Sequence, residues 1–199
     1  MSHATALPSR NPRATATDPA RTSETGVAAP DDTTRPRVVT SAAARGALAL
    51  LRIAVSIVFL WPVLDKTLGL GYATPSERAW LNGGSPTQGY LSSLEGPLAG
   101  TFGALAGPAT DWLFMLGMGA TGLALLLGVG TRVAAVSGTL LMAMLWATTW
   151  PLAAGSNNPI VEDHVVTALV VIVVALTRAG ETFGLGGLAA RVGVPGWMR

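Results

Sequence analysis

The amino-acid sequence predicts an all-α integral membrane protein, a four-transmembrane-helix bundle with short helices in one long outer loop. Three observations predict this class. The chain of 199 residues is 50% hydrophobic and only 12% charged, which is about half the charge of ordinary soluble domains. Its mean hydropathy is +0.47. Four apolar segments also approach the ~20 residues that a helix needs to cross a bilayer.

Residues 1–40 form the first predicted unit, a disordered cytoplasmic tail. The segment consists mostly of Ala, Thr, Pro, Ser, Arg and Asp, with almost no large apolar side chain. Such a composition cannot bury enough surface to offset the entropy that is lost on ordering. The first apolar run begins near Gly46 and has the length of a span. We therefore expect this run to be retained as a helix rather than removed as a signal peptide.

The membrane domain, residues 41–180, contains the four predicted spans, and a short cytoplasmic segment, residues 181–199, follows it. The second and third spans are separated by only a short Gly-Thr-Arg link, so we expect them to form a helical hairpin. The fourth span opens at Asn158–Pro159, a capping residue followed by proline at the first helical position. The predicted spans are residues 47–64, 112–129, 133–150 and 159–177.

The long loop, residues 66–110, carries helix signals of its own. The stretches TPSE at 74–77 and SPTQ at 85–88 both match the capping box, and each has proline at the first helical position. Gly83 and Gly84 predict a hinge between two short helices, and a third, weaker helical pattern follows near Phe102. We expect this loop to form a lid over the outer end of the bundle.

Charge and tryptophan placement predict the orientation. Lys66 and Arg78 are the only basic residues of the predicted outer segments, whereas the other arginines near the spans would all lie inside if the N-terminus is cytoplasmic. The positive-inside rule then places both termini in the cytoplasm of a multi-pass protein of the cell inner (plasma) membrane. Trp61, Trp112 and Trp150 fall at the outer ends of their spans, as an aromatic belt requires.

Several kinds of chemistry are excluded or disfavoured. The chain has no cysteine, which excludes disulfides, thiolate metal sites and haem attachment through a CxxCH motif. His164 is the only histidine outside the tail, so no second histidine or thiol completes a metal site there. The net charge is only +2, and the arginines lie in tails and short turns. The predicted partner is therefore the lipid bilayer and not nucleic acid.

A set of motifs follows in a fixed order along residues 51–187. Its members are Arg52, Trp61-Pro62, Asp65-Lys66, Trp80, Gly83 to Thr87, Asp111-Trp112, Gly128, Thr131-Arg132, Asn158-Pro159 and Asp163-His164. This set resembles the DoxX-like membrane proteins, and most of all the DoxD-type subunit of thiosulfate:quinone oxidoreductase. The resemblance implies a four-span bundle linked to respiratory or sulfur redox chemistry, with quinone as the electron acceptor and a second, smaller redox subunit as a partner.

Candidate catalytic residues are His164, Asp163 and Asp65, which with Lys66 and Glu162 are expected near the outer interface. They form either an interfacial charge network or the rim of a pocket in which quinone reduction takes up protons through His164. His164 itself is either a packing histidine or a proton-exchanging one. The candidate quinone-binding residues are Arg52, Lys66, Trp80, Ser85, Thr87 and Asn158.

Arg52 lies inside the first span, where an arginine costs several kcal/mol unless it reaches water or a partner. It either bonds to helix carbonyls or the inner interface, or it contacts an anionic ligand or a quinone oxygen.

Two functions stay open. The chain is either the redox subunit described above or a non-catalytic membrane scaffold that docks soluble redox or stress proteins through its tail and cytoplasmic turns. A small-solute transporter is disfavoured, because the inverted repeat of many transporters is not visible. The sequence also leaves open a homo-oligomer.

Overall fold

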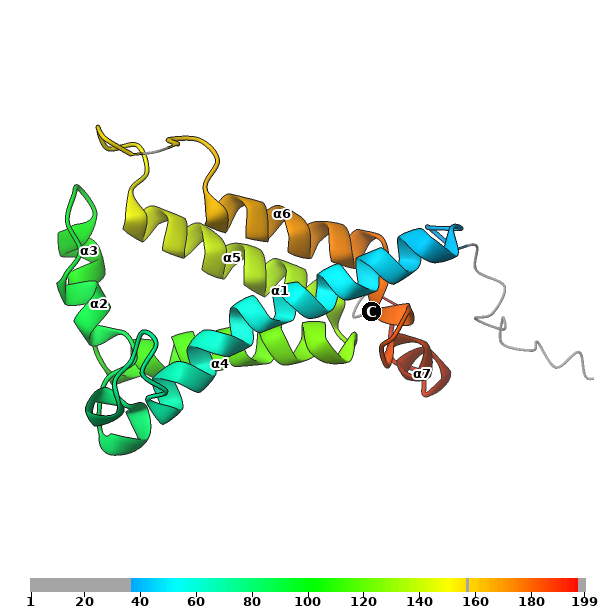
Figure 1. Cartoon of the computed structure of the whole chain (residues 1–199), viewed down its shortest axis with the longest axis horizontal. Helices are drawn as coiled ribbons and strands as arrows, with labels where there is room; N and C mark the ends of the chain where they lie inside the picture. The colour runs from blue at the N-terminus through cyan, green and yellow to red at the C-terminus, as the bar shows by residue number, and fades with distance from the viewer. Residues whose placement is uncertain (1–36, 157, 197–199) are drawn as a thin grey trace, which may run out of the picture. The chain divides into compact units, whose positions relative to one another are not determined.

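The computed structural model describes residues 37–156 and 158–196, and in these residues the only regular elements are helices. Of the predicted tail, residues 1–36 lie outside the described residues. Figure 1 shows four long helices, with shorter ones in the α1–α4 connection and near the C-terminus. The long helices are α1 (Ala42–Leu68), α4 (Pro108–Leu127), α5 (Thr131–Thr149) and α6 (Asp163–Leu176).

Helix α1 extends beyond the predicted span 47–64 at both ends. Ser41 caps its start, because the side-chain oxygen accepts a hydrogen bond from the Ala44 amide at 3.4 Å. At the other end Gly69 adopts a left-handed conformation with φ of 65°, and its amide bonds to the carbonyl of Asp65. Polar caps, and not the limits of the apolar run, therefore set the length of this helix.

Helices α4 and α5 form the predicted hairpin. Pro108 stands at the start of α4, where its missing N–H removes no helical hydrogen bond. Gly128 ends α4 with φ of 73°, and Gly130 precedes α5 with φ of 68°. Two left-handed residues close together let the chain reverse within a few residues, because glycine adopts this conformation without a steric penalty.

Helix α6 begins later than predicted and is only 14 residues long. The Asn158 side-chain oxygen accepts hydrogen bonds from the amides of Ile160 at 3.0 Å and Val161 at 3.1 Å, which forms a turn and not a helical start. Glu162 caps the helix instead, because its carboxylate accepts a hydrogen bond from the His164 amide. The predicted start at Pro159 was therefore wrong by about one helical turn.

The α1–α4 connection contains four short helices. The first predicted capping box yields only a 3₁₀ turn, η2, and no side chain caps it. In the second, the Ser85 hydroxyl accepts a hydrogen bond from the Gln88 amide at 3.0 Å, at the start of α2. The elements are η2 (Ser76–Arg78), η3 (Trp80–Asn82), α2 (Gln88–Ser92) and α3 (Ala99–Gly103).

Each long helix packs against two others, in the order α1, α4, α5, α6 and back to α1. Close approach depends on small residues: a Cβ placed on Gly122 would lie 2.6 Å from Leu60 Cγ, so a larger residue would force α1 and α4 apart. After α6 come η4 (Ala179–Glu181) and α7 (Gly186–Arg191). The core consists of Val55, Phe59, Met118, Leu125, Ala134, Met142, Val171, Val174 and Ala179.

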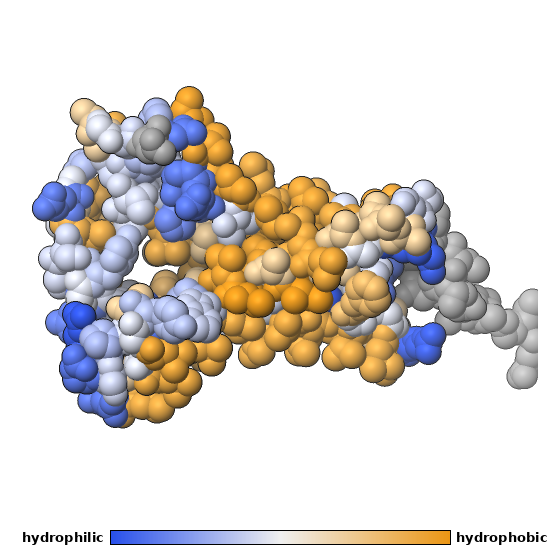
Figure 2. Space-filling view, in the orientation of Figure 1, coloured by the Kyte–Doolittle hydropathy of each residue, from blue (hydrophilic) through white to orange (hydrophobic). Residues whose placement is uncertain are grey.

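Three helices, α1, α4 and α5, are long and apolar enough to cross a membrane. Helix α6 rises only ~21 Å, against the ~30 Å of a bilayer core, so its length does not by itself establish a fourth span. Figure 2 shows a broad apolar surface over the long helices and hydrophilic residues gathered at the end where α2 and α3 lie. The chain is therefore an all-helical membrane protein with three candidate spans among the described residues.

Most of the arginines near the long helices gather at one end of the helices and most of the acidic residues at the other, with Lys66, Arg78 and Glu181 as exceptions. We call the end where α1 begins and α4 finishes the basic end, and the opposite end the acidic end. Arg37, Arg45, Arg132 and Arg178 belong to the basic end, whereas Asp65, Asp111, Glu162 and Asp163 belong to the acidic end.

Candidate functional site

Arg52 lies fully buried in α1, with 0% of its surface exposed. Its Nη1 donates to the carbonyl oxygens of Leu125 and of Leu126, the latter at 2.7 Å. Its Nη2 donates to the Phe183 carbonyl at 2.8 Å. The last carbonyls of α4 lack helical partners and carry partial negative charge. The guanidinium group therefore caps α4 and ties the segment after η4 to it, at the basic end of the bundle.

Closely packed glycines surround this arginine. A Cβ on Gly180 would lie 2.3 Å from the carbonyl oxygen of Gly128, and a Cβ on Gly128 would lie 3.1 Å from Arg52 Nη1. The chain after α6 can approach the end of α4 so closely only because both positions lack a side chain. The Leu185 amide completes the contact by donating to the Leu127 carbonyl at 2.8 Å.

Asp65, near the end of α1, holds the first residues of the α1–α4 connection. Its side chain is 1% exposed. One carboxylate oxygen accepts a hydrogen bond from the Tyr72 amide at 3.3 Å, and the other accepts one from the Ala73 amide at 3.1 Å. The Tyr72 ring also packs edge-on against Trp61, with 5.0 Å between the ring centroids. The local role of Asp65 is therefore to fold the chain back onto α1.

Asp111, in the first turn of α4, accepts hydrogen bonds from two of the candidate quinone-binding residues. Its carboxylate, on a residue only 6% exposed, accepts hydrogen bonds from the Thr87 amide at 2.9 Å and the Thr87 hydroxyl at 2.6 Å. The Ser85 hydroxyl donates to the same carboxylate at 2.8 Å. Ser85 and Thr87 are thus engaged by a protein carboxylate. Sequence reasoning did not assign Asp111 this role, although an acidic residue just after Pro108 was an available signal.

The remaining candidates near Asp111 are Lys66 and Trp80. Lys66 lies within electrostatic reach of both Asp65 and Asp111, and no hydrogen bond joins its ammonium group to another residue of the described part of the chain. Trp80 packs edge-on against Trp112, with 4.6 Å between the ring centroids. The structure therefore brings Asp65, Lys66, Ser85 and Thr87 together around the start of α4.

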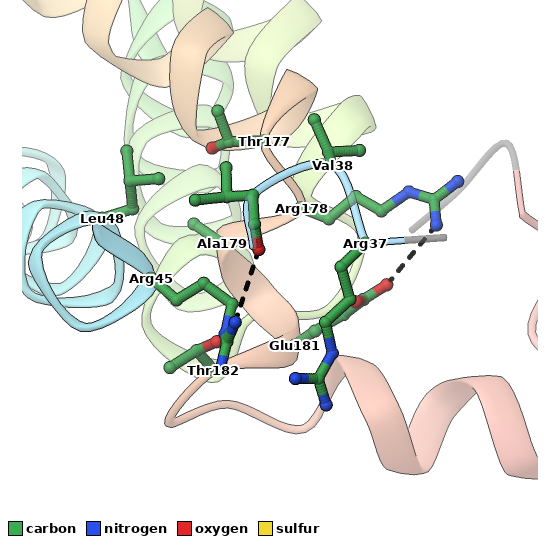
Figure 3. Close-up of a pocket in the computed structure, with 10 residues that line it drawn as sticks. Arg37, Val38, Arg45, Leu48, Thr177, Arg178, Ala179, Glu181 and Thr182 are labelled. Atoms are coloured by element: carbon green, nitrogen blue, oxygen red, sulfur yellow. Dashed lines mark hydrogen bonds and ion pairs between the residues drawn. The ribbon is translucent and has the colours of Figure 1, made fainter. Parts of the chain in front are cut away.

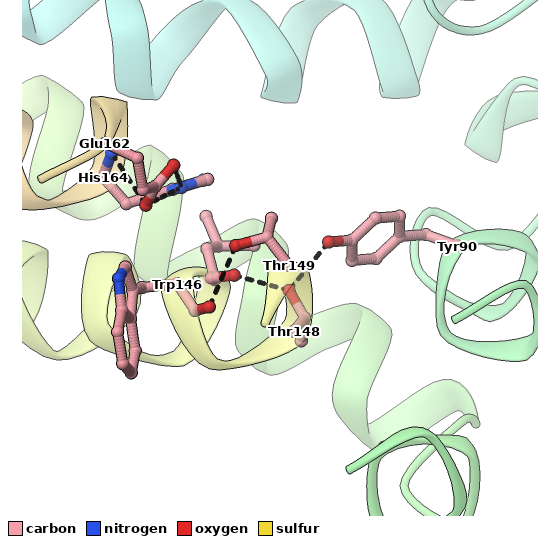
Figure 4. Close-up of polar contacts among 7 residues, drawn as sticks. Tyr90, Trp146, Thr148, Thr149, Glu162 and His164 are labelled. Carbon is pink, nitrogen blue, oxygen red and sulfur yellow. Dashed lines mark hydrogen bonds and ion pairs between the residues drawn. The ribbon is translucent and has the colours of Figure 1, made fainter. Parts of the chain in front are cut away.

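His164 belongs to a separate group at the start of α6, shown in Figure 4. Its Nδ1 lies 2.7 Å and 2.9 Å from the two carboxylate oxygens of Glu162, and the two side chains are 25% and 22% exposed. Asp163 is exposed, and its carboxylate accepts no hydrogen bond from another of the described residues. The partner of His164 is thus Glu162, which stands in extended conformation just before the helix.

Helix α5 contributes further polar groups near the same end. The Tyr90 hydroxyl lies 2.7 Å from the Thr148 hydroxyl, a contact that joins α2 to α5 (Figure 4). The buried indole nitrogen of Trp146 has no hydrogen-bond partner within the described residues. Neither Tyr90 nor Trp146 was a predicted site residue, because neither belongs to a motif with recognisable spacing.

The site at the acidic end therefore has two parts. One part consists of the two carboxylates of Asp65 and Asp111, together with Lys66. These carboxylates fold the α1–α4 connection. The other is the His164–Glu162 pair on α6. Within residues 37–156 and 158–196 no hydrogen bond or ion pair links the two parts. Arg52 belongs to neither, since its guanidinium contacts lie at the basic end.

Comparison of the chain with protein-family models, with curated proteins and with solved structures found no match in any of the three. The resemblance to DoxX-like proteins stays a prediction from the motifs.

Proposed function

We propose that this chain is a membrane-embedded redox subunit, similar to the DoxX-like and DoxD-type proteins, that passes electrons from thiosulfate or another sulfur compound to quinone. The observation that carries the proposal is the His164–Glu162 pair at the start of an apolar helix. Glu162 holds Nδ1 at 2.7 Å, so the Nε2 atom is left to exchange a proton with a ligand. A carboxylate that orients an imidazole in this way is a common arrangement in general acid–base catalysis.

The proposed arrangement has four crossings, with both termini in the cytoplasm and the chain in the inner (plasma) membrane. Support for the fourth crossing comes from the position of the residues that follow α6. Thr177 and Arg178 line the same pocket as Arg45 and Leu48 of α1. If α1 starts on the cytoplasmic side, α6 must therefore return to that side. The arginines gathered at the basic end favour the cytoplasm for that end.

Reduction of a quinone to a quinol consumes two electrons and two protons. In this proposal the electrons come from the sulfur donor through a second redox subunit, and His164 gives a proton from Nε2 to the quinone oxygen. Glu162 stabilises the charged imidazole before transfer, and exposed Asp163 provides a route for a new proton from water. The Trp146 indole N–H, which has no partner among the described residues, can donate a further hydrogen bond to a quinone oxygen. A ligand is a natural partner for this group, because buried donors rarely lack one.

The first experiment extracts lipophilic molecules from the purified protein and identifies them by mass spectrometry. Quinone is the expected result. The second measures reduction of a soluble quinone analogue with thiosulfate and the reconstituted partner. His164→Gln should lower kcat at least ~100-fold, because the variant lacks the group that gives the proton to the quinone oxygen.

Glu162→Gln and Asp163→Asn form a matched pair of neighbouring acidic residues. Loss of the Glu162 charge should lower kcat about tenfold with little change in KM, because that group acts through His164. Asp163→Asn should reduce kcat less than twofold, since water can replace an exposed carboxylate. Normal turnover in His164→Gln would rule out the mechanism. Soluble proteins that co-purify without quinone would favour the membrane scaffold.

A further inference from the structure

A small pocket at the basic end brings together arginines from two distant parts of the chain. Its walls come from the segment before α1, the first turns of α1, and the residues between α6 and α7. Figure 3 shows Arg37, Arg45 and Arg178 around it, with Glu181 as the acidic side chain among the residues that line it. The pocket therefore carries an excess of positive charge and is separate from the His164–Glu162 pair at the opposite end.

Backbone contacts hold Arg45 and the opposite wall in place. The Arg45 Nη1 atom donates to the carbonyls of Thr40 at 2.6 Å and Val39 at 3.4 Å, which fixes the segment before α1 and leaves the other guanidinium donors for a ligand. Behind the opposite wall, the buried Arg52 donates to the carbonyls of Thr182, which lines the pocket, and Phe183, at 3.5 Å and 2.8 Å. The pocket thus has walls supported by the buried core of the bundle.

Arg178 occupies an unusual backbone conformation. Its φ is 51°, in the left-handed region that costs an L-residue with a side chain of this size ~1 kcal/mol or more. Its only ionic contact with a described residue is to Glu181, at 3.9 Å, and both side chains are substantially exposed. An ion pair with so long a distance and so much exposure contributes little to the stability of the fold. The strained backbone places a guanidinium group at the pocket without a strong protein partner.

The size of the pocket limits what it can hold. Its volume is about 80 Å³, well below the ~300–1,000 Å³ of sites that enclose a drug-sized ligand. A small anionic group fits this volume, whereas a complete cofactor does not. Arginine guanidinium groups bind phosphate oxygens in a bidentate manner.

Apolar residues adjoin the charged ones. Val38 and Leu48 line the pocket, and Leu50 and Leu51 are exposed on the neighbouring turns of α1. A free phosphate gains nothing from such neighbours, but the acyl chains of a lipid bury them. We propose that this pocket binds the phosphodiester group of an anionic membrane lipid, with the acyl chains lying along the apolar face of α1.

The test uses the full chain, purified in detergent and stripped of lipid, and titrates it with phosphatidylglycerol. Native mass spectrometry should detect one saturable lipid, and phosphatidylcholine with the same acyl chains should bind at least ~10-fold more weakly. Arg45→Gln and Arg178→Gln should each weaken phosphatidylglycerol binding about 10–100-fold, because each removes charge-assisted hydrogen bonds. Arg132→Gln and Arg191→Gln are matched controls, since these exposed arginines do not line the pocket.

Each alternative gives a different result. Equal binding of phosphatidylcholine would overturn the proposal, because the site would then not require a lipid with net negative charge. Equal weakening by Arg132→Gln would also overturn it, because the lipid would then respond only to the general charge of this end. Glycerol phosphate or inorganic phosphate that binds as tightly as the lipid would show a soluble anion as the ligand and would also overturn it. Melting temperatures identify variants that fail to fold. Arg37→Gln, at an exposed residue, should fold normally and still weaken lipid binding at least threefold; unchanged binding in this variant would contradict the proposal.

Discussion

At the scale of the residue, Arg52 shows how a charged side chain can be stable in an apolar bundle. It has no carboxylate partner among the described residues. Instead, backbone carbonyls from the end of α4 and from the segment after η4 accept its hydrogen bonds. The exposed end of a helix supplies partial negative charge without any acidic residue. This arginine therefore serves to join three segments at the basic end.

Substitution of Arg52 should mainly affect stability. Arg52→Gln removes the charged donor that the carbonyls of Leu126 and Phe183 accept from, at ~2–3 kcal/mol, which lowers the melting temperature by roughly 5–10 °C. The melting temperature of Arg52→Lys should fall between those of the wild type and Arg52→Gln, because an ammonium group keeps the charge but cannot contact the same set of carbonyls. Thermal unfolding of the detergent-solubilised protein measures the melting temperatures of both Arg52 variants, with Arg132→Gln as the surface control. A wild-type melting temperature for Arg52→Gln would contradict this role.

At the scale of the element, two buried carboxylates fold the α1–α4 connection. Asp65 holds the residues just after α1, and Asp111 holds Ser85 and Thr87 at the start of α4. Tyr90 adds a contact to α5 through Thr148. The connection contains only short helices, which are marginal without tertiary contacts. Its order should therefore depend on these few polar contacts.

Removal of the Asp111 carboxylate should loosen this connection without unfolding the long helices. In Asp111→Ala, amide hydrogen exchange across residues 85–92 should be about 10–100-fold faster, because hydrogen bonds to a buried charge contribute ~1.5–3 kcal/mol. Exchange in α5 should not change. Glu95→Ala is the control, because Glu95 is an exposed acidic residue of the same connection. Equal exchange rates in Asp111→Ala and the wild type would show that other contacts order the segment.

At the scale of the whole molecule, the return of α6 to the start of α1 bears on the number of crossings. Residues of α1 and residues that directly follow α6 line the pocket at the basic end. A helix of 14 residues can complete a crossing only if the residues before it extend the path or the bilayer thins around it. Among the described residues three helices have the required length, and the fourth crossing stays a proposal that labelling can test.

Cysteine labelling can count the crossings, because the chain has no cysteine of its own. Ser92, Ser156 and Gly187 are exposed and can each be replaced by cysteine. An impermeant maleimide should label Ser92→Cys and Ser156→Cys in intact cells, and Gly187→Cys only after the membrane is opened, because α6 separates residues 156 and 187. Labelling of Gly187→Cys from outside, together with Ser156→Cys, would mean that α6 does not cross.

Much of the fold follows from local sequence. Apolar runs and the short Gly-Thr-Arg link are enough to predict the long helices and the hairpin, because helix formation depends on neighbouring residues. The start of α4 was missed, since the helix begins at Pro108 and the predicted span began at residue 112. The helix limits were less predictable. Glu162, and not Asn158, caps α6, since both residues can cap a helix and only the following backbone decides between them.

The candidate site shows the limit of prediction from sequence. Composition and motifs alone were sufficient to identify a membrane protein and to single out Arg52, Asp65 and His164 as unusual polar residues. Only the tertiary structure decided their partners: Arg52 bonds to Phe183, which is 131 residues away, and Asp111 bonds to Ser85, 26 residues away. Helical periodicity describes neighbours within a few turns, whereas these contacts depend on how separate helices pack. The arginine pocket arises in the same way, because Arg45 and Arg178 meet only when α6 returns to the start of α1.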